Sequence, residues 1–231
     1  MSAAVLLDPA RLDRPDTLVL RQPFPFMVAH GQLPDEARSE LDRDFPRYSS
    51  AGFFPYDPRD CGPSVNALIA DMTAPAFAGA VGARLGIDNL HQYPTLVTVC
   101  RLLNKRHGTI HTDSRSKVAT ALIYLSAQWP DTSDGCLRFL HKIDDIDSLI
   151  APELIPLYGE FAVFKRCDNS FHGHLPYEGE RRVIQVAWLT SEDEKLRKTK
   201  RGKFSRAFKK LFGRLDTQLG AGRDRNASHP D

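Results

Sequence analysis

The sequence has little cysteine, and the cysteines it has are scattered. None of the four, Cys61, Cys100, Cys136 and Cys167, forms a Cys-x-x-Cys pair, which argues against a zinc ribbon and does not suggest a disulfide scaffold. The chain also lacks a charged start followed by an apolar stretch, and it has no apolar run of about 18 residues. We therefore expect a soluble, cytoplasmic protein.

Neither sign of charge dominates, and no internal repeat or low-complexity block is visible. The net charge is +2 over 231 residues, so the protein as a whole has no field that would attract nucleic acid. Hydrophobic residues make up 42% of the chain and charged residues 26%, which is ordinary for a globular protein. This length and composition predict one domain with a full core, plus tails.

The first third of the chain predicts an irregular arm followed by helical support. Residues 1–23 are rich in Pro, Asp and Arg and predict the arm, and residues 24–30 predict a first strand. Pro34 stands where a helix would begin, and residues 33–86 are expected to support the domain with helices. One helical face is formed by Leu33, Ala37, Leu41 and Phe45, and two further short helices are expected at 65–72 and 76–85.

From residue 93 the pattern changes to strands, and the expected domain covers residues 24–190 with its β core at 93–190. Apolar and β-branched runs separated by turn signals predict strands at 95–103, 117–125, 137–140, 161–164 and 183–189. A helix-like insert is expected at 144–150. Helices do not alternate with the later strands, which gives an α/β fold little weight. The pattern predicts a mostly β fold, a sandwich or jelly roll fronted by helices.

A His-Thr-Asp triplet and a distant histidine are the most specific feature of the sequence. His111 and Asp113 would point to one side of a strand and converge on one metal, although such a pair alone is more often a surface turn. His172 follows about 60 residues later. Two imidazoles and one carboxylate cover one face of octahedral Fe(II) and leave the other open for substrate and oxygen. Arg182 can hold the far carboxylate of a chelating organic acid.

The stretch from Arg101 to Trp188 resembles the 2-oxoglutarate and Fe(II)-dependent oxygenases, especially the prolyl-4-hydroxylase-like branch. The pieces that match, in order and spacing, are His111-Thr-Asp113, Thr120-Ala-Leu-Ile-Tyr-Leu-Ser126, Asp134-Gly-Cys-Leu-Arg-Phe139, Pro156-Leu-Tyr-Gly-Glu-Phe-Ala-Val-Phe164, His172-Gly-His and Arg182 six residues before Trp188. The resemblance implies a double-stranded β-helix, a jelly-roll barrel with iron near one mouth.

The resemblance also implies roles for single residues and a reaction. His111, Asp113 and His172 would bind Fe(II), Arg182 would anchor 2-oxoglutarate, and Tyr124 would donate a hydrogen bond to it. The reaction would hydroxylate a C–H bond and convert 2-oxoglutarate to succinate and CO2, with ascorbate as a candidate reductant.

Three alternatives stay open within this site. His174 competes with His172 as a ligand, and Arg181 competes with Arg182 as the anchor. Strand parity favours Arg182, because it shares a side with Ile184, Val186 and Trp188 and the family's anchor shares a side with the equivalent tryptophan. His107 is expected at the rim.

The C-terminal part of the chain is strongly basic. Residues 195–214 contain ten Lys or Arg and no acidic residue, and residues 195–219 predict an amphipathic helix with an apolar stripe. A helix of this kind can lie on an anionic membrane surface through 203–219, at the inner membrane surface, or dock on the domain or a second subunit. Nucleic acid would leave the apolar stripe unused. Residues 220–231 are expected to be disordered.

Three functions compete: an oxygenase, a non-catalytic jelly-roll binding module and a zinc hydrolase that uses the same residues. The complete triad and anchor favour the oxygenase, acting on a small-molecule, glycan or peptide substrate. A protein prolyl hydroxylase is the alternative by analogy alone. A polar rim suited to an acidic or glycan-like ligand is expected from Asn104, His107, Arg115, Lys117 and His174.

Overall fold

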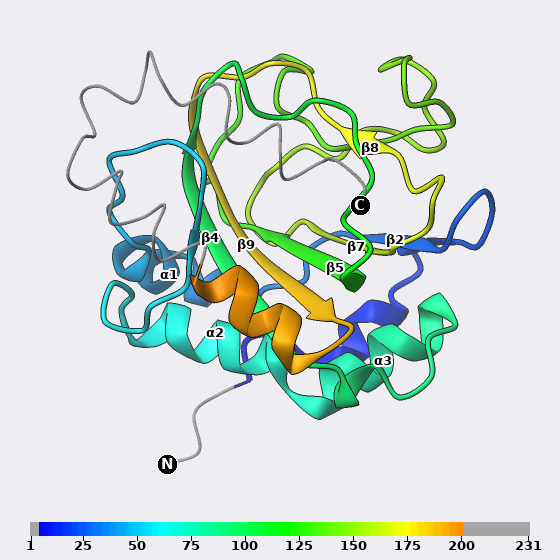
Figure 1. Cartoon of the computed structure of the whole chain (residues 1–231). Coiled ribbons are helices and arrows are strands. Elements are labelled where there is room, and N and C mark those ends of the chain that lie inside the picture. The colour runs from blue at the N-terminus through cyan, green and yellow to red at the C-terminus, as the bar shows by residue number, and fades with distance from the viewer. Residues whose placement is uncertain (1–4, 201–231) are drawn as a thin grey trace.

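A seven-stranded antiparallel sheet is the largest element of the computed structural model, which describes residues 5–200 (Figure 1). Its strands follow the order β1 (Leu18–Leu20), β2 (Phe26–Ala29), β7 (Phe161–Lys165), β5 (Lys117–Tyr124), β9 (Gly179–Leu189), β4 (Thr95–Leu103) and β3 (Phe53–Pro55). A second sheet pairs β6 (Arg138–Phe139) with β8 (His172–Gly173) and lies opposite one face of the first (Figure 1). This is the jelly-roll core that the sequence predicts.

Helices cover the other face of the large sheet (Figure 1). They are α1 (Arg38–Asp44), α2 (Pro63–Thr73) and α3 (Pro75–Leu85), with 3-10 turns η1 (Pro9–Asp13), η2 (Asp35–Ala37) and η3 (Leu90–Gln92). Pro63 and Pro75 occupy first-turn positions, where the missing N–H costs nothing. Gly86 ends α3 in the left-handed region, with φ 66°. The three α-helices lie within residues 33–86, where the sequence predicts helical support.

Each strand divides its side chains between two apolar clusters because successive residues point to opposite faces. On β5, Ala121 and Ile123 pack toward the helices, whereas Leu122 and Tyr124 point between the two sheets. The cluster between the sheets also contains Phe24, Phe26, Phe139, Phe164 and Val183. Burial of each such phenylalanine contributes roughly 1.5–3 kcal/mol. The space between the sheets is therefore a packed interior, and its polar residues need a separate explanation.

Two local predictions are wrong. The arm at residues 5–23 is ordered by η1 and β1, and Leu7 and Leu12 are buried. The carboxylate of Asp71 on α2 accepts the N–H groups of Leu6 and Leu7, which fastens the arm to the helices. Residues 144–150 form turns instead of a helix. The Arg138 guanidinium donates to the carbonyl of Ile146 and to the Asp147 carboxylate in this segment. These bonds favour a folded-back loop.

The described part of the C-terminal region is a helix over residues 192–200. The remainder of the helix predicted at 195–219, its apolar stripe and the tail at 220–231 lie outside the described residues. Within 5–200, no single helix is long and apolar enough to cross a membrane. Only α2 and α3 together, bent by 49° where they meet, reach that length and composition, and their apolar sides lie in the core.

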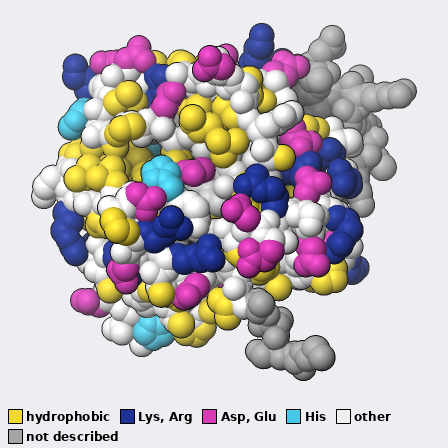
Figure 2. Space-filling view, turned by 180° about the vertical axis from the view of Figure 1, so that it is seen from behind, with side chains coloured by type: hydrophobic (Ala, Val, Ile, Leu, Met, Phe, Trp, Pro, Cys, Tyr) yellow, Lys and Arg dark blue, Asp and Glu magenta, His cyan; other side chains and the backbone are white. Residues whose placement is uncertain are grey.

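Acidic and basic side chains are intermingled on the face shown in Figure 2. No broad field of one sign covers that face, in agreement with the net charge of +2. Electrostatic effects in this protein therefore depend on ion pairs and charged groups at particular sites.

Candidate metal centre

A short backbone pairing brings the two histidines of the predicted triad together. The His111 N–H donates to the carbonyl of His172, and the His172 N–H donates to the carbonyl of His111, each at 3.0 Å. Strand β8 carries His172, and His111 lies in the segment between β4 and β5. Their ring centroids are 4.4 Å apart. The pairing therefore fixes two imidazoles side by side although they are distant in the chain.

Asp113 completes the group, and the three side chains offer converging donor atoms. One ligand atom from each of His111, Asp113 and His172 lies within 4.8 Å of the others. Asp113 is 7% exposed and His172 6% exposed. Within residues 5–200 this is the one group of three or more His, Cys, Asp or Glu side chains close enough to hold a metal ion. The structure thus brings together the three residues that the sequence predicts as metal ligands.

The hydrogen bonds of the imidazoles prepare their other ring nitrogens for a metal. Nδ1 of His111 lies 2.8 Å from the carbonyl of Thr109, and Nδ1 of His172 lies 2.9 Å from the carbonyl of Ser170. A carbonyl can only accept, so each Nδ1 carries the proton and each Nε2 keeps its lone pair. A backbone carbonyl on the far nitrogen is the usual partner of a metal-bound histidine. The tautomers needed for metal binding are therefore already in place.

The carboxylate of Asp113 is held in its charged form by its neighbours. Lys117 Nζ lies 2.6 Å from Oδ1 of Asp113, and the Thr120 hydroxyl donates to Oδ2. Burial by itself would raise the pKa of Asp113, but Lys117 and the two histidines outweigh burial and hold the pKa well below its usual range. The pKa of His172 falls to about 3, first because it is buried and second because His111 is adjacent. Both ligands are thus deprotonated near neutral pH.

This donor set fits ferrous iron. Two neutral imidazoles and one carboxylate, with no thiolate among the three, form the facial arrangement of mononuclear Fe(II) oxygenases and leave coordination positions free. A structural zinc site would be closed by a fourth protein ligand, and the group in residues 5–200 has three members. The residues present therefore suit an open iron site.

The two arginines at the start of β9 point to opposite faces of the sheet. Arg182 lies on the helix side, where its guanidinium pairs with Asp42 of α1 and with Glu180. Arg181 points between the sheets and donates to the Tyr124 hydroxyl at 3.0 Å and to the carbonyl of Gly135 at 2.8 Å. Tyr124 is fully buried, and burial raises the pKa of its phenol.

This placement separates Arg182, the predicted anchor, from the triad. Arg182 does share a side with Trp188, as the strand parity requires, but that side packs against the helices. Thr120 of β5 bonds Asp113, and Leu122 and Tyr124 follow it on the interior face. Tyr124 and Arg181 therefore share the interior with the triad, and Arg182 does not.

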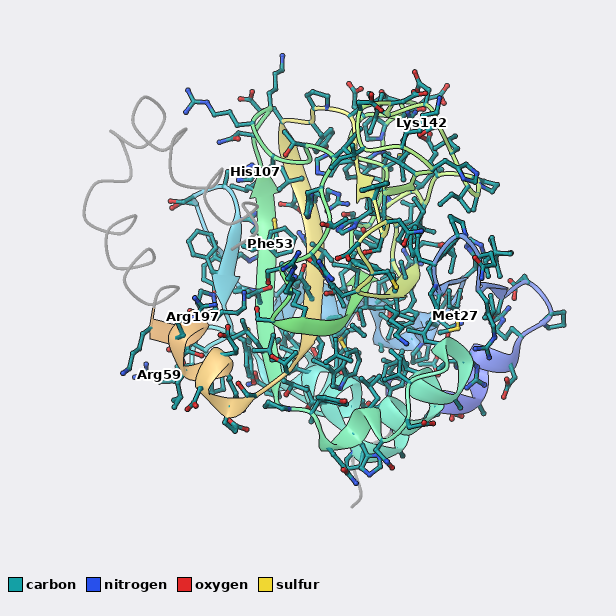
Figure 3. The ribbon with its side chains drawn as sticks, turned by 45° about the vertical axis from the view of Figure 1, so that its right-hand side comes forward. Met27, Phe53, Arg59, His107, Lys142 and Arg197 are labelled. Carbon is teal, nitrogen blue, oxygen red and sulfur yellow. The ribbon has the colours of Figure 1, made fainter. Side chains whose placement is uncertain are left out.

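His174 and His107 lie outside the triad. The His174 ring packs against Gly108, a glycine with φ 89°, and its Nδ1 donates to the carbonyl of Leu175. Its pKa is lowered to about 3, first by burial and then by Arg181. His107 lies in the loop beyond β4, and Arg197 marks the C-terminal helix at the other end of the sheet (Figure 3). His107 and His174 line a pocket of about 210 Å³, together with Lys105, Ile110, Ile146 and Pro176.

Comparison with known proteins agrees with this geometry. Residues 97–190 match the family model described as the 2OG-Fe(II) oxygenase superfamily. These residues are similar to a 2OG-Fe(II) oxygenase domain. The matched segment contains the whole triad, Tyr124 and both arginines, so the sequence family and the site coincide. No curated protein matches the chain.

Two solved structures share the fold of the oxygenase domain. A prolyl-4-hydroxylase from Pseudomonas putida superposes with a TM-score of 0.51 at 18% identity, covering 72% of this chain and 92% of its own. A prolyl hydroxylase from Trichoplax adhaerens, in complex with a hypoxia inducible factor peptide fragment, has a TM-score of 0.50 at 15% identity and covers 74% of this chain and 86% of its own. At these identities the likeness establishes the jelly-roll fold.

Sequence reasoning missed the contacts that support Asp113. Lys117 was expected only at the rim and Thr120 only as part of a strand, yet both bind the carboxylate directly. Their spacing contains a weak signal, because Lys117 follows Asp113 by four residues and Thr120 begins the interior face of β5. The chain bends between Asp113 and β5, and this bend brings Lys117 and Thr120 back to the Asp113 carboxylate. The spacing of the residues does not predict the bend.

Proposed function

We propose that the protein is a 2-oxoglutarate- and Fe(II)-dependent hydroxylase. The observation that carries this proposal is the convergence of His111, Asp113 and His172, with both Nε2 atoms and a charged carboxylate available to one ion. Bound ferrous iron would supply the oxidation of a substrate C–H bond to an alcohol by O2, coupled to conversion of 2-oxoglutarate to succinate and CO2.

Arg181 is the residue we assign to the distal carboxylate of 2-oxoglutarate. Arg181 is 3% exposed, and among the described residues its hydrogen bonds go to a carbonyl and a phenol, with no carboxylate in an ion pair. A buried charge without a counter-ion is costly. A dicarboxylate that reaches from the metal would supply the missing negative charge.

Tyr124 is positioned to share that carboxylate. Its hydroxyl accepts a hydrogen bond from Arg181, which leaves its own proton free to be donated. Thr120 and Tyr124 are four residues apart on one face of β5, a separation of about 13 Å along the strand. A five-carbon dicarboxylate with its metal bonds can bridge a gap of this size. Tyr124 therefore keeps the role that the resemblance implies, next to Arg181 instead of Arg182.

Other residues hold the ligands and exclude water. Lys117 and Thr120 orient the Asp113 carboxylate, and the carbonyls of Thr109 and Ser170 orient the two rings. The ring of Phe164 packs on His172, with centroids 4.3 Å apart. Phe139 packs against Phe164 behind it. This apolar wall shields one side of the metal site from solvent.

Succinate formation tests the proposal. The full chain, loaded with Fe(II) and supplied with O2, 2-oxoglutarate and ascorbate as a candidate reductant, should release succinate. His111→Ala should reduce the rate at least about a hundredfold, because loss of a ligand exceeds the 10–100-fold effect of losing an outer-shell partner. His91→Ala, at an exposed site, is the matched control and should not change the rate.

The same assay separates the competing functions. A binding module would give no succinate with any substrate. A zinc hydrolase would give none either, and its activity would follow added Zn²⁺ without a need for O2. Lack of succinate from the iron-loaded wild type, even with candidate substrates, would contradict the proposal.

The substrate class we propose is a small molecule, glycan or peptide. A protein prolyl hydroxylase is one member of this range, since the two structural neighbours carry that name. A search of cell extracts for compounds that gain one oxygen atom in the presence of wild-type protein, and not of His111→Ala, would identify the substrate directly.

A further inference from the structure

Two lysines from distant parts of the chain meet beside the metal centre. Lys117, at the start of β5, pairs with Asp113, and its side chain is 14% exposed. Lys198 belongs to the helix at 192–200, and its ammonium donates to the Ser114 hydroxyl at 3.1 Å. Ser114 directly follows the ligand Asp113. The C-terminal helix therefore delivers a positive charge to the segment that holds the metal ligand.

The positive charge of Lys117 disfavours the charged form of Lys198. The pKa of Lys198 is lowered, first by burial and next by Lys117, against partial compensation from Glu194 and Asp113. Glu194 forms an ion pair with Arg197 at 2.7 Å. The acidic groups near Lys198 are thus already engaged, Glu194 by Arg197 and Asp113 by Lys117 and Thr120.

Counting charges in the assembled site leaves a positive excess. Ferrous iron brings two positive charges, and Lys117, Lys198 and Arg181 bring three more. Asp113 and the two carboxylates of 2-oxoglutarate supply three negative charges. Arg166, which donates to the Asp113 carbonyl, is neutralised by Asp168. Two positive charges then remain in a partly buried site, where an unbalanced charge is costly and attracts anions.

We infer that the substrate carries a negatively charged group, a carboxylate or a phosphate, which binds at Lys198 and Lys117 beside the metal. This inference rests on the proposed function and adds the chemical class of its substrate. Lys198 contacts the hydroxyl of Ser114 and no metal ligand, so it can turn to an anion without releasing Asp113. Lys117 stays on Asp113 and contributes its field. The C-terminal helix thereby acts as a specificity element for the oxygenase domain.

Paramagnetic relaxation by Mn(II) tests this inference without a known substrate. The full chain is loaded with Mn(II) and 2-oxoglutarate, and inorganic phosphate is titrated while its phosphorus relaxation is measured, because the relaxation depends on distance from the metal. We expect saturable binding with strong relaxation. Lys198→Met should weaken phosphate binding about tenfold or more, as loss of one charge-assisted hydrogen bond predicts. Lys198→Arg should retain most of the binding.

A second lysine on the same helix provides the control. Lys195 pairs with Glu192, its side chain is 38% exposed, and Lys195→Met should leave phosphate binding unchanged. Equal weakening by Lys195→Met and Lys198→Met, or none by Lys198→Met, would overturn the inference. Acetate labelled with carbon-13 serves as a second probe and shows whether carboxylate or phosphate is preferred.

The outcomes distinguish this inference from the proposed function. Mn(II) and 2-oxoglutarate binding are measured on the same samples. If both bind and phosphate shows no saturable relaxation, the anionic-substrate inference is wrong and the oxygenase proposal stands. If the wild type binds no Mn(II), the oxygenase proposal and this inference fail together.

Discussion

Arg181 and Arg182 are neighbours on one strand, yet the two faces of the sheet give them opposite surroundings. Arg182 points to the helices, where Asp42 and Glu180 neutralise it and the ring of Phe45 lies under its guanidinium. Arg181 points between the sheets, where a phenol and a carbonyl are its hydrogen-bond partners. Both residues are buried, Arg182 at 7% and Arg181 at 3% exposure.

The difference teaches how to separate a structural charge from a ligand-binding charge. A buried arginine whose carboxylates come from its own chain is complete without a ligand, and its role is to join elements. A buried arginine without a carboxylate keeps a charge that a bound anion can satisfy. The arginine on the helix-facing side of the sheet is thus structural, whereas the arginine on the interior side can bind a ligand.

Substituting each arginine in turn tests this comparison, and it has the largest expected effect. Arg181→Met should raise the KM for 2-oxoglutarate by about 10–150-fold, the range that corresponds to a charged hydrogen-bond contribution of about 1.5–3 kcal/mol. Arg182→Met should leave that KM unchanged and lower the free energy of unfolding by about 1–2 kcal/mol, because an ion pair and a packed stem are lost. Steady-state kinetics and denaturant unfolding measure both. A larger KM effect from Arg182→Met would reverse the assignment.

The dependence of folding stability on pH extends the comparison to a histidine in the interior and a histidine at an exposed position. In the metal-free protein the pKa of His172 is about 3, against an ordinary value of 6.5. As the pH falls below about 6.5, the unfolded chain binds a proton at this residue and the folded chain does not. Stability should therefore decrease with falling pH, by up to about 1.4 kcal/mol per pH unit from this group.

Two histidine variants isolate that contribution. His172→Asn should reduce the slope of unfolding free energy against pH between about 6 and 4 by up to about 1.4 kcal/mol per pH unit, because one of the buried groups whose pKa is lowered on folding is gone and His174 remains. His91→Asn, at an exposed position, should leave the slope of the wild type unchanged. Identical slopes for all three proteins would show that His172 is not buried in its neutral form.

Tyr124→Phe should give the smallest of these effects. It removes one neutral hydroxyl from the interior face and leaves the ring in place, so the KM for 2-oxoglutarate should rise by about 2–10-fold, as expected for a hydrogen bond worth about 0.5–1.5 kcal/mol. Tyr158→Phe removes a hydroxyl that bonds the Pro34 carbonyl away from the site and should not change the KM. An equal rise in both variants would remove Tyr124 from the binding site.

The sequence predicts the strands because they depend on local pattern. The triad does not depend on local pattern, because His111 and Asp113 lie between β4 and β5 and His172 follows about 60 residues later, and the order of motifs in the family resemblance is what connects them. The choice between Arg181 and Arg182 depends on which face the helices cover. That is decided by packing of distant elements, and parity with Trp188 selects the face that the helices cover. The turn at 144–150 likewise depends on Arg138, whose guanidinium arrives from another strand.

Metal titration tests the central claim most directly. Mn(II), which resembles ferrous iron in its ligand preference, is titrated calorimetrically into the metal-free full chain and into Asp113→Asn. The account predicts one ion bound per wild-type chain and loss of that binding in the variant, whose amide keeps the size of the side chain without its charge. Equal affinity in the two proteins, or no binding to the wild type, would contradict it.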